Sequence, residues 1–156
     1  MRIALIGTGN LATHLVKAVE KCPQVECVQW IGRRREPPTN FQNIRYFTDY
    51  QHTIKTDICL LAVSDDAIPS FAQQLKEIDT LVAHTSGAIS LKALEPVRRK
   101  GVFYPLQSFI HNLAVDWGKI PICVEAESNE DTQTLESLAY LLSKEVHIIT
   151  EQQRLH

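Results

Sequence analysis

A glycine turn near the start of the chain separates an apolar segment from a segment with helical spacing. The apolar run Arg2–Ile6 predicts a strand, and the residues after the turn predict a helix over residues 10–21. Between them, Gly7 would permit a tight turn, Gly9 would let a pyrophosphate approach the backbone, and Ala12 would let the helix pack closely on the strand. A helix start also presents unpaired N–H groups to an anion, so G-x-G-x-x-A in this context predicts dinucleotide binding, with an ordinary glycine turn as the alternative. The residues assigned to this part of the cofactor site are Gly7, Thr8, Gly9, Asn10, Leu11 and Ala12.

Short apolar runs and helical segments alternate along the rest of the chain. Further strands are predicted at residues 25–31, 44–47, 58–63, 81–83, 102–104, 120–124 and 146–149. Helices are predicted at 90–100 with an interruption at Pro96, at 129–142, after Asp65 or Asp66 as the capping residue, and before Asp57 from a capping box of Thr48 and Gln51. This alternation predicts the α/β class, with a doubly wound, mostly parallel Rossmann-like sheet and helices on both faces.

The composition suits one globular domain and argues against several kinds of partner. The chain has 156 residues, of which 44% are hydrophobic and 22% charged, enough for a substantial core. A net charge of −2 with dispersed Lys and Arg argues against nucleic acid or a membrane surface as a partner. Because no long apolar segment indicates a signal peptide or a membrane span, we expect a cytoplasmic protein.

The four cysteines show neither a C-x-x-C pair nor ligand-like spacing. Cys59 and Cys123 lie within apolar runs, so we expect them to be small buried residues. The sequence therefore predicts no disulfide framework and no metal site.

The last residues predict the beginning of another helix. Thr150 and Gln153 have the spacing of a capping box, so residues 151–156 would form its first turns. Because a single domain seldom stops at a helix start, we expect a further domain beyond this chain, with a short terminal tail as the alternative.

Several segments together resemble a known family. They are, in order, MRIALIGTGNLATHL, LLAVSDDAI, VAHTSGAISL and GVFYPLQSF. The chain resembles two-domain Rossmann-like NADP oxidoreductases of the deazaflavin-dependent type, which carry a C-terminal helical domain of unknown function, and it is similar to the cofactor domains of pyrroline-carboxylate reductases and prephenate dehydrogenases. The resemblance implies NADP(H) as cofactor, a small-molecule substrate, and a homodimer in which the second domain closes the substrate cleft.

The segment after the second predicted strand indicates which nucleotide is bound. NAD-binding domains place an acidic residue there to accept hydrogen bonds from the ribose, but this chain has no acid before Glu36. Arg33 and Arg34 could instead bind a 2′-phosphate, which a carboxylate would repel. We therefore predict NADP(H), with a solvated basic loop as the alternative reading of these arginines.

One further strand end is expected to meet the cofactor. The backbone of Ala62, Val63 and Ser64 follows a buried strand and should lie along a ribose. The carboxylates of Asp65 and Asp66, which follow directly, fit helix capping better than acid–base chemistry.

Candidate catalytic residues follow the later strands. His84 and Ser86 could face the nicotinamide or a substrate carbonyl, although His84 could equally be a strand-end histidine satisfied by backbone. Gln107 could bind a substrate carboxylate or amide, but a proline turn with a packing aromatic is the slightly favoured reading of its segment. Tyr104 stands where related dehydrogenases have a histidine, so the acid–base role of that histidine does not transfer.

The leading hypothesis is an NADP(H)-dependent oxidoreductase that reduces a small carbonyl or imine compound, with catalytic candidates His84, Ser86 and Gln107. The alternative is a sensor or regulatory module that binds NADP(H) without catalysis. A methyltransferase that uses S-adenosylmethionine is less favoured, because arginines occupy the place of its ribose-binding acid.

Overall fold

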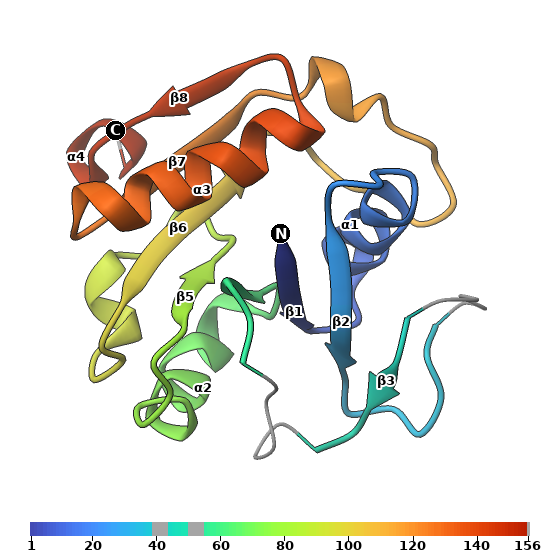
Figure 1. Cartoon of the computed structure of the whole chain (residues 1–156), viewed down its shortest axis with the longest axis horizontal. Helices are drawn as coiled ribbons and strands as arrows, with labels where there is room; N and C mark the ends of the chain where they lie inside the picture. Colours follow the sequence, from blue (N-terminus) through green and yellow to red (C-terminus); the bar gives the residue numbers. More distant parts are fainter. Residues whose placement is uncertain (39–43, 50–54, 156) are drawn as a thin grey trace.

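The computed structural model describes residues 1–38, 44–49 and 55–155, which form one twisted sheet flanked by helices (Figure 1). The sheet of the described residues has eight strands in the order β3-β2-β1-β4-β5-β6-β7-β8. These strands are β1 (Arg2–Ile6), β2 (Glu26–Ile31), β3 (Tyr46–Phe47), β4 (Ile58–Leu61), β5 (Leu81–His84), β6 (Lys100–Pro105), β7 (Ile122–Ala126) and β8 (Val146–Ile148). The strand order reverses between β1 and β4, where ligands of open α/β sheets bind.

The pairing within the sheet confirms the predicted fold class. All neighbouring strands run parallel except β6 and β7, which are antiparallel. The central strands β4 and β5 are buried along their whole length, as expected for parallel strands covered on both faces. The fold is therefore a doubly wound, mostly parallel Rossmann-like sheet.

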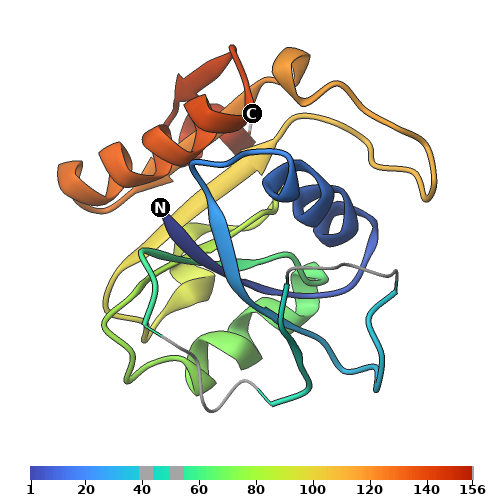
Figure 2. The ribbon, with the colours of Figure 1, turned by 45° about the vertical axis from the view of Figure 1, so that its right-hand side comes forward.

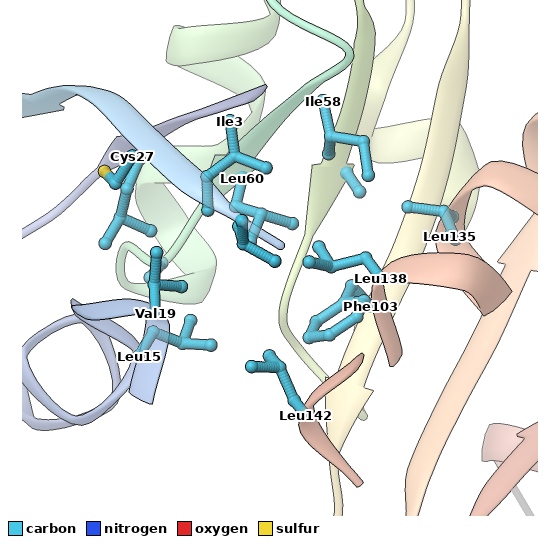
Figure 3. Packing of buried hydrophobic residues seen from close by; sticks show 14 of the residues in the cluster. Ile3, Leu15, Val19, Cys27, Ile58, Leu60, Phe103, Leu135, Leu138 and Leu142 are labelled. Carbon is cyan, nitrogen blue, oxygen red and sulfur yellow. The ribbon is translucent and has the colours of Figure 1, made fainter. Parts of the chain in front are cut away.

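Helices cover both faces of this sheet (Figure 2). They are α1 (Asn10–Glu20), α2 (Ile68–Gln74), α3 (Asn129–Leu142) and α4 (Glu151–Leu155), with the 3-10 turns η1 (Asp65–Ala67), η2 (Leu91–Leu94) and η3 (Trp117–Lys119). Ile3 and Leu5 of β1 belong to a core that includes residues of α1 and α3, whereas Ala4 and Ile6 belong to a second core that includes residues of α2 and η2. The alternation of side chains along a strand thus divides the interior in two. Figure 3 shows the first core, where Leu15 of α1 and Leu138 of α3 approach the sheet.

Three predicted elements differ from the structure. The helical segment predicted at 90–100 ends before Pro96, as expected from a residue without an N–H, but it is only the turn η2 and no helix follows the proline. The strand predicted at 120–124 is β7, which begins two residues later, at Ile122, because η3 ends at Lys119 and Ile120 caps it. The turn η1 is preceded by Ser64, and neither Asp65 nor Asp66 caps a helix, so that capping prediction was wrong. The capping box of Thr48 and Gln51 includes a residue outside the described ones.

The helix predicted at the end of the chain is present. The side-chain oxygen of Gln153 accepts a hydrogen bond from the backbone N–H of Thr150 at 2.8 Å, and the hydroxyl of Thr150 accepts one from the N–H of Gln153 at 3.3 Å. This reciprocal pair confirms the capping box, and α4 follows it directly.

The cysteines are all free thiols, and they differ in burial. Cys27 and Cys59 are buried, and burial raises the pKa of each thiol to about 12. Cys123 is only half-buried, so the expectation of full burial was wrong for this residue; it lies on β7, near the edge of the sheet. Within the described ranges, no group of three or more His, Cys, Asp or Glu residues lies close enough to hold a metal ion. None of the helices described is long and apolar enough to cross a membrane.

Candidate functional site

The glycine turn is held between two neighbouring strands. Gly7 has φ +122°, and a Cβ atom at this position would lie only 2.0 Å from the carbonyl oxygen of Ala62. Its N–H donates to the carbonyl of Ile31 at 2.8 Å, and its own carbonyl accepts a hydrogen bond from the indole N–H of Trp30 at 2.7 Å. The turn therefore needs glycine at this position, and β2 and β4 determine its place.

The second glycine leaves the helix start accessible. Gly9 precedes α1 as its N-cap, and no side chain caps the first turn. A Cβ atom on Gly9 would meet nothing within 4 Å. The first N–H groups of α1 thus have no intrahelical partner and border an open space, which suits an anion.

A pocket of about 820 Å³ opens at this point, beside the carboxyl ends of β1 and β4. Most of the residues predicted for the cofactor line it. These are Gly7, Thr8, Gly9, Asn10, Leu11, Arg33, Arg34, Ala62, Val63 and Ser64, together with the catalytic candidate Ser86. The exception among the cofactor residues is Ala12, which is fully buried and packs in the core below the turn.

The segment that carries the arginines lies against the glycine turn. A Cβ atom on Gly32 would meet the side chains of Thr8 at 2.3 Å and Tyr46 at 2.4 Å, so the chain passes close to both. The hydroxyl of Tyr46 donates to the backbone carbonyl of Arg34 at 2.8 Å. Arg33 and Arg34 are exposed at the rim, and their side chains are available to an anion in the pocket.

Sequence reasoning missed the pocket wall formed by α2. Ser70, Phe71 and Gln74 line the pocket. Their spacing places them on one side of α2, while Ile68 and Ala72 are buried on the other. The only available signal was this amphipathic pattern, which does not by itself show that the exposed face borders a ligand site.

His84 does not line the pocket. Its side chain is fully buried at the end of β5, and its Nδ1 atom accepts a hydrogen bond from the N–H of Ser86 at 3.1 Å. Its Nε2 atom has no hydrogen-bond partner among the described residues. Burial, followed by the nearby charge of Arg154, lowers the pKa of His84 to about 4. The imidazole is therefore neutral near pH 7, with its proton on Nε2.

Gln107 also lies outside the pocket lining. It is exposed, and among the described residues its side-chain nitrogen donates only to the carbonyl of Ser108, at 3.5 Å. The segment after β6 is instead attached to α1, because Asn10 donates to the carbonyl of Phe109 at 3.1 Å and the ring of His14 lies 2.9 Å from the carbonyl oxygen of Ile110. Of the three catalytic candidates, the structure places only Ser86 in the pocket wall.

Comparison with known proteins agrees with this architecture. The chain is similar to a candidate NADP oxidoreductase from Bacteroides fragilis, with 32% identity and a TM-score of 0.86, over 99% of this chain and 62% of that one. It also has the fold of Plasmodium falciparum pyrroline carboxylate reductase with NADP bound (15% identity, TM-score 0.73, 98% and 59% of the two chains). A prephenate dehydrogenase from A. aeolicus in complex with hydroxyphenyl propionate and NAD+ shares the fold at 10% identity, with a TM-score of 0.79 over 99% and 61% of the two chains.

The chain thus spans about three fifths of the length of these solved proteins. A model of the Rossmann-like domain matches residues 1–111, which include the glycine turn and β1 to β6. On the strength of this match, the chain belongs to the Rossmann-like domain family.

Proposed function

We propose that this chain binds NADP(H) and forms the cofactor domain of an oxidoreductase that reduces a small carbonyl or imine compound. The observation that carries the proposal is the position of two exposed arginines on the rim of the same pocket that contains the open helix start. The helix start would hold the pyrophosphate shared by NAD and NADP, and the two arginines would hold the additional phosphate of NADP. The related proteins that contain NADP or NAD support a nicotinamide cofactor.

The pocket fits such a molecule in shape and in polar groups. The space beside Gly9 admits a pyrophosphate against the backbone, because even an added Cβ atom would touch nothing there. The backbone of Ala62 to Ser64 forms the next part of the wall, in keeping with a contact to the ribose. Arg33 and Arg34 follow β2 with no carboxylate before Glu36, so no acid at this strand end would repel a 2′-phosphate.

At the far end of the pocket, Ser86 is the side chain best placed to hydrogen-bond a reacting oxygen. A bound nicotinamide supplies the hydride chemistry, while the protein orients it. The burial of His84 favours a supporting role, in which it binds the backbone of Ser86 rather than the substrate. Gln107 remains a candidate contact for a substrate carboxylate or amide.

For the complete protein we propose a second, helical domain that closes the substrate side of the pocket and forms a homodimer. The length of the related solved proteins supports this, since the chain accounts for only 62% of the Bacteroides fragilis protein. A deazaflavin as the redox partner belongs to the same proposal and follows from the family resemblance. We also propose a cytoplasmic location, on the sequence argument given above.

Titration of the chain with NADPH and NADH tests the cofactor assignment. We expect NADPH to bind at least tenfold more tightly, and the double variant Arg33→Ala/Arg34→Ala to lose most of that preference because the charged hydrogen bonds to the phosphate are gone. Arg35→Ala is a matched control, since Arg35 lies in the same basic run but outside the pocket lining. Equal affinities for the two nucleotides, or an unchanged preference in the double variant, would refute the assignment.

One observation favours the second candidate function, a sensor that binds NADP(H) without turnover. Asp65 is the only carboxylate in the pocket lining of the described residues, and no histidine or lysine accompanies it. NADPH oxidation by the full-length protein with imines, ketoacids and deazaflavin distinguishes the candidates. Tight binding without oxidation of NADPH in any of these assays would support the sensor.

A further inference from the structure

A buried arginine on α4 holds the loop between β5 and η2, hereafter the β5–η2 loop (residues 85–90). The side chain of Arg154 is 1% exposed. Its Nη1 atom donates to three carbonyls of this loop, those of Ser86 at 3.3 Å, Gly87 at 3.1 Å and Ile89 at 2.7 Å. One guanidinium therefore binds the backbone of this short loop at three carbonyls, although the loop is more than sixty residues away in the sequence.

The charge of this arginine has a partner on β7. Its Nη2 atom lies 3.5 Å from a carboxylate oxygen of Glu125, whose side chain is 16% exposed. The other oxygen of Glu125 accepts a hydrogen bond from the N–H of Glu151, at 2.9 Å, at the first residue of α4. Because a buried guanidinium is tolerated only where it is paired and hydrogen-bonded, these contacts give Arg154 a single favoured position.

A second contact from α4 reaches the end of the same loop. A carboxylate oxygen of Glu151 accepts hydrogen bonds from the hydroxyl of Ser90 at 2.9 Å and from the N–H of Leu91 at 3.1 Å. These two bonds, the Ser90 bond first, lower the pKa of Glu151. The β5–η2 loop is thus attached to α4 at both of its ends.

The contacts of Arg154 also determine the direction of the N–H groups in the loop. In a planar trans peptide the carbonyl and the following N–H point in opposite directions. Since the carbonyl of Gly87 faces Arg154, the N–H of Ala88 points away from it, and this N–H donates to the hydroxyl oxygen of Ser86 at 3.1 Å. The hydroxyl oxygen is then engaged as an acceptor, which leaves the hydroxyl hydrogen of Ser86 free to be donated.

We propose that Arg154 is a positioning residue that fixes the β5–η2 loop, so that Ser86 presents its hydroxyl hydrogen to a carbonyl or carboxamide oxygen bound in the pocket. The ligand class is therefore one with an acceptor oxygen at this point, such as the carboxamide of a nicotinamide. The ligand in this proposal rests on the proposed function, whereas the attachment of the loop to α4 does not. The proposal also accounts for the buried charge of Arg154, which lies on α4 and outside the pocket lining.

The first experiment follows the loop without any ligand. Amide hydrogen exchange is measured in the wild-type chain, Arg154→Gln and Arg98→Gln, a control in which an exposed arginine loses its ion pair with Glu77 at 3.6 Å. We expect exchange at Ala88 and Leu91 to become roughly tenfold faster or more in Arg154→Gln and to stay unchanged in Arg98→Gln. Unchanged exchange at both amides would overturn the proposal. If Arg154→Gln does not fold by circular dichroism, Arg154→Lys, which keeps the charge beside Glu125 with fewer donors, is judged by the same criterion.

The second experiment asks whether Arg154 acts on the ligand through Ser86. The dissociation constant of NADPH is measured for the wild-type chain, Arg154→Gln, Ser86→Ala and the double variant, with Arg154→Lys in place of Arg154→Gln if the latter does not fold. We expect each single variant to weaken binding by roughly tenfold, and the double variant to bind no more weakly than Ser86→Ala. If the fold-losses of NADPH affinity in the two single variants multiply in the double variant, Arg154 acts independently of Ser86 and the proposal is overturned. Failure of the wild-type chain to bind NADPH would instead refute the proposed function and the ligand named here, while the exchange experiment still decides the attachment of the loop.

Discussion

The Nδ1 atom of His84 accepts a hydrogen bond from the backbone N–H of Ser86 at 3.1 Å, which connects the buried end of β5 to the wall of the pocket. An acceptor nitrogen carries no proton, so the neutral ring must be protonated on Nε2. Protonation of Nδ1 would place two N–H groups against each other in the interior. The neutral state of His84 is therefore part of the folded structure.

The stability of the chain should fall as the pH is lowered from about 6.5 to about 4. The pKa of His84 is about 4 in the folded chain and rises to its ordinary value of 6.5 on unfolding. Between these pH values His84 binds a proton in the unfolded chain but not in the folded chain. The contribution of His84 to the free energy of unfolding is therefore fully present above pH 6.5 and is lost as the pH falls toward 4. The full loss is on the order of 3 kcal/mol in the free energy of unfolding.

Urea unfolding at a series of pH values, in wild type and His84→Asn, measures this effect. Asn keeps a side-chain acceptor for the N–H of Ser86 but does not titrate. We expect a smaller slope between pH 6.5 and 4.5 in His84→Asn, because the substitution removes the titrating imidazole. Equal slopes would show that His84 is charged in the folded state or titrates normally.

Gly7→Ala should mainly reduce the stability of the fold, whereas Gly9→Ala should mainly reduce the affinity for NADPH. At Gly7 the added Cβ atom would clash with the carbonyl oxygen of Ala62 at a positive φ, so the free energy of unfolding should fall by at least about 2 kcal/mol. At Gly9 there is open space, so stability should change by no more than about 1 kcal/mol. The methyl group of Gly9→Ala would nevertheless occupy the space proposed for the pyrophosphate.

Thermal unfolding and NADPH titration of both variants check this prediction. Gly9→Ala should remain folded and bind NADPH at least tenfold more weakly than wild type. A Gly9→Ala variant with wild-type affinity would show that no phosphate approaches the backbone at this turn. A stable Gly7→Ala variant would show that the turn can move away from β4.

Trp30→Phe should destabilise the glycine turn, because it removes a hydrogen bond to the backbone of Gly7. The indole N–H of Trp30 donates to the carbonyl of Gly7 at 2.7 Å, and a phenyl ring leaves that oxygen without this donor. We expect a loss of about 1–3 kcal/mol in the free energy of unfolding, measured by urea titration, together with weaker NADPH binding. Trp117→Phe is the matched control, because Trp117 stacks on Phe109 and does not line the pocket beside the turn. Equal losses of NADPH affinity in the two variants would contradict a specific role for Trp30.

His14→Phe should release the segment after β6 from α1. The substitution keeps a ring beside Phe109 but removes the hydrogen bond from His14 to the carbonyl of Ile110. We expect faster amide exchange in residues 107–113 and a loss of about 1 kcal/mol in stability. Lys17→Ala, one turn further along α1, should change neither quantity. Unaltered exchange in His14→Phe would show that other contacts hold the segment.

Features that depend on neighbours in the chain were determined by the sequence itself. The glycine turn, the strand and helix alternation, and α3 at Asn129–Leu142 follow from local spacing, and so does the capping box before α4. The interruption predicted at Pro96 is local too, although the apolar spacing around this proline produced only the turn η2. Such features could be read from the residues because the interactions that form them span a few positions.

Only the tertiary structure decided the contacts between segments that are distant in the sequence. It buried His84 and left Ser86 in the pocket wall, added Phe71 of α2 to the lining, and joined Arg154 to carbonyls beyond β5. These outcomes depend on how the sheet twists and on which helix covers which face, and the spacing of residues does not specify either. The charge and hydrogen bonds of each group followed from that packing, because burial and partners are properties of the assembled fold.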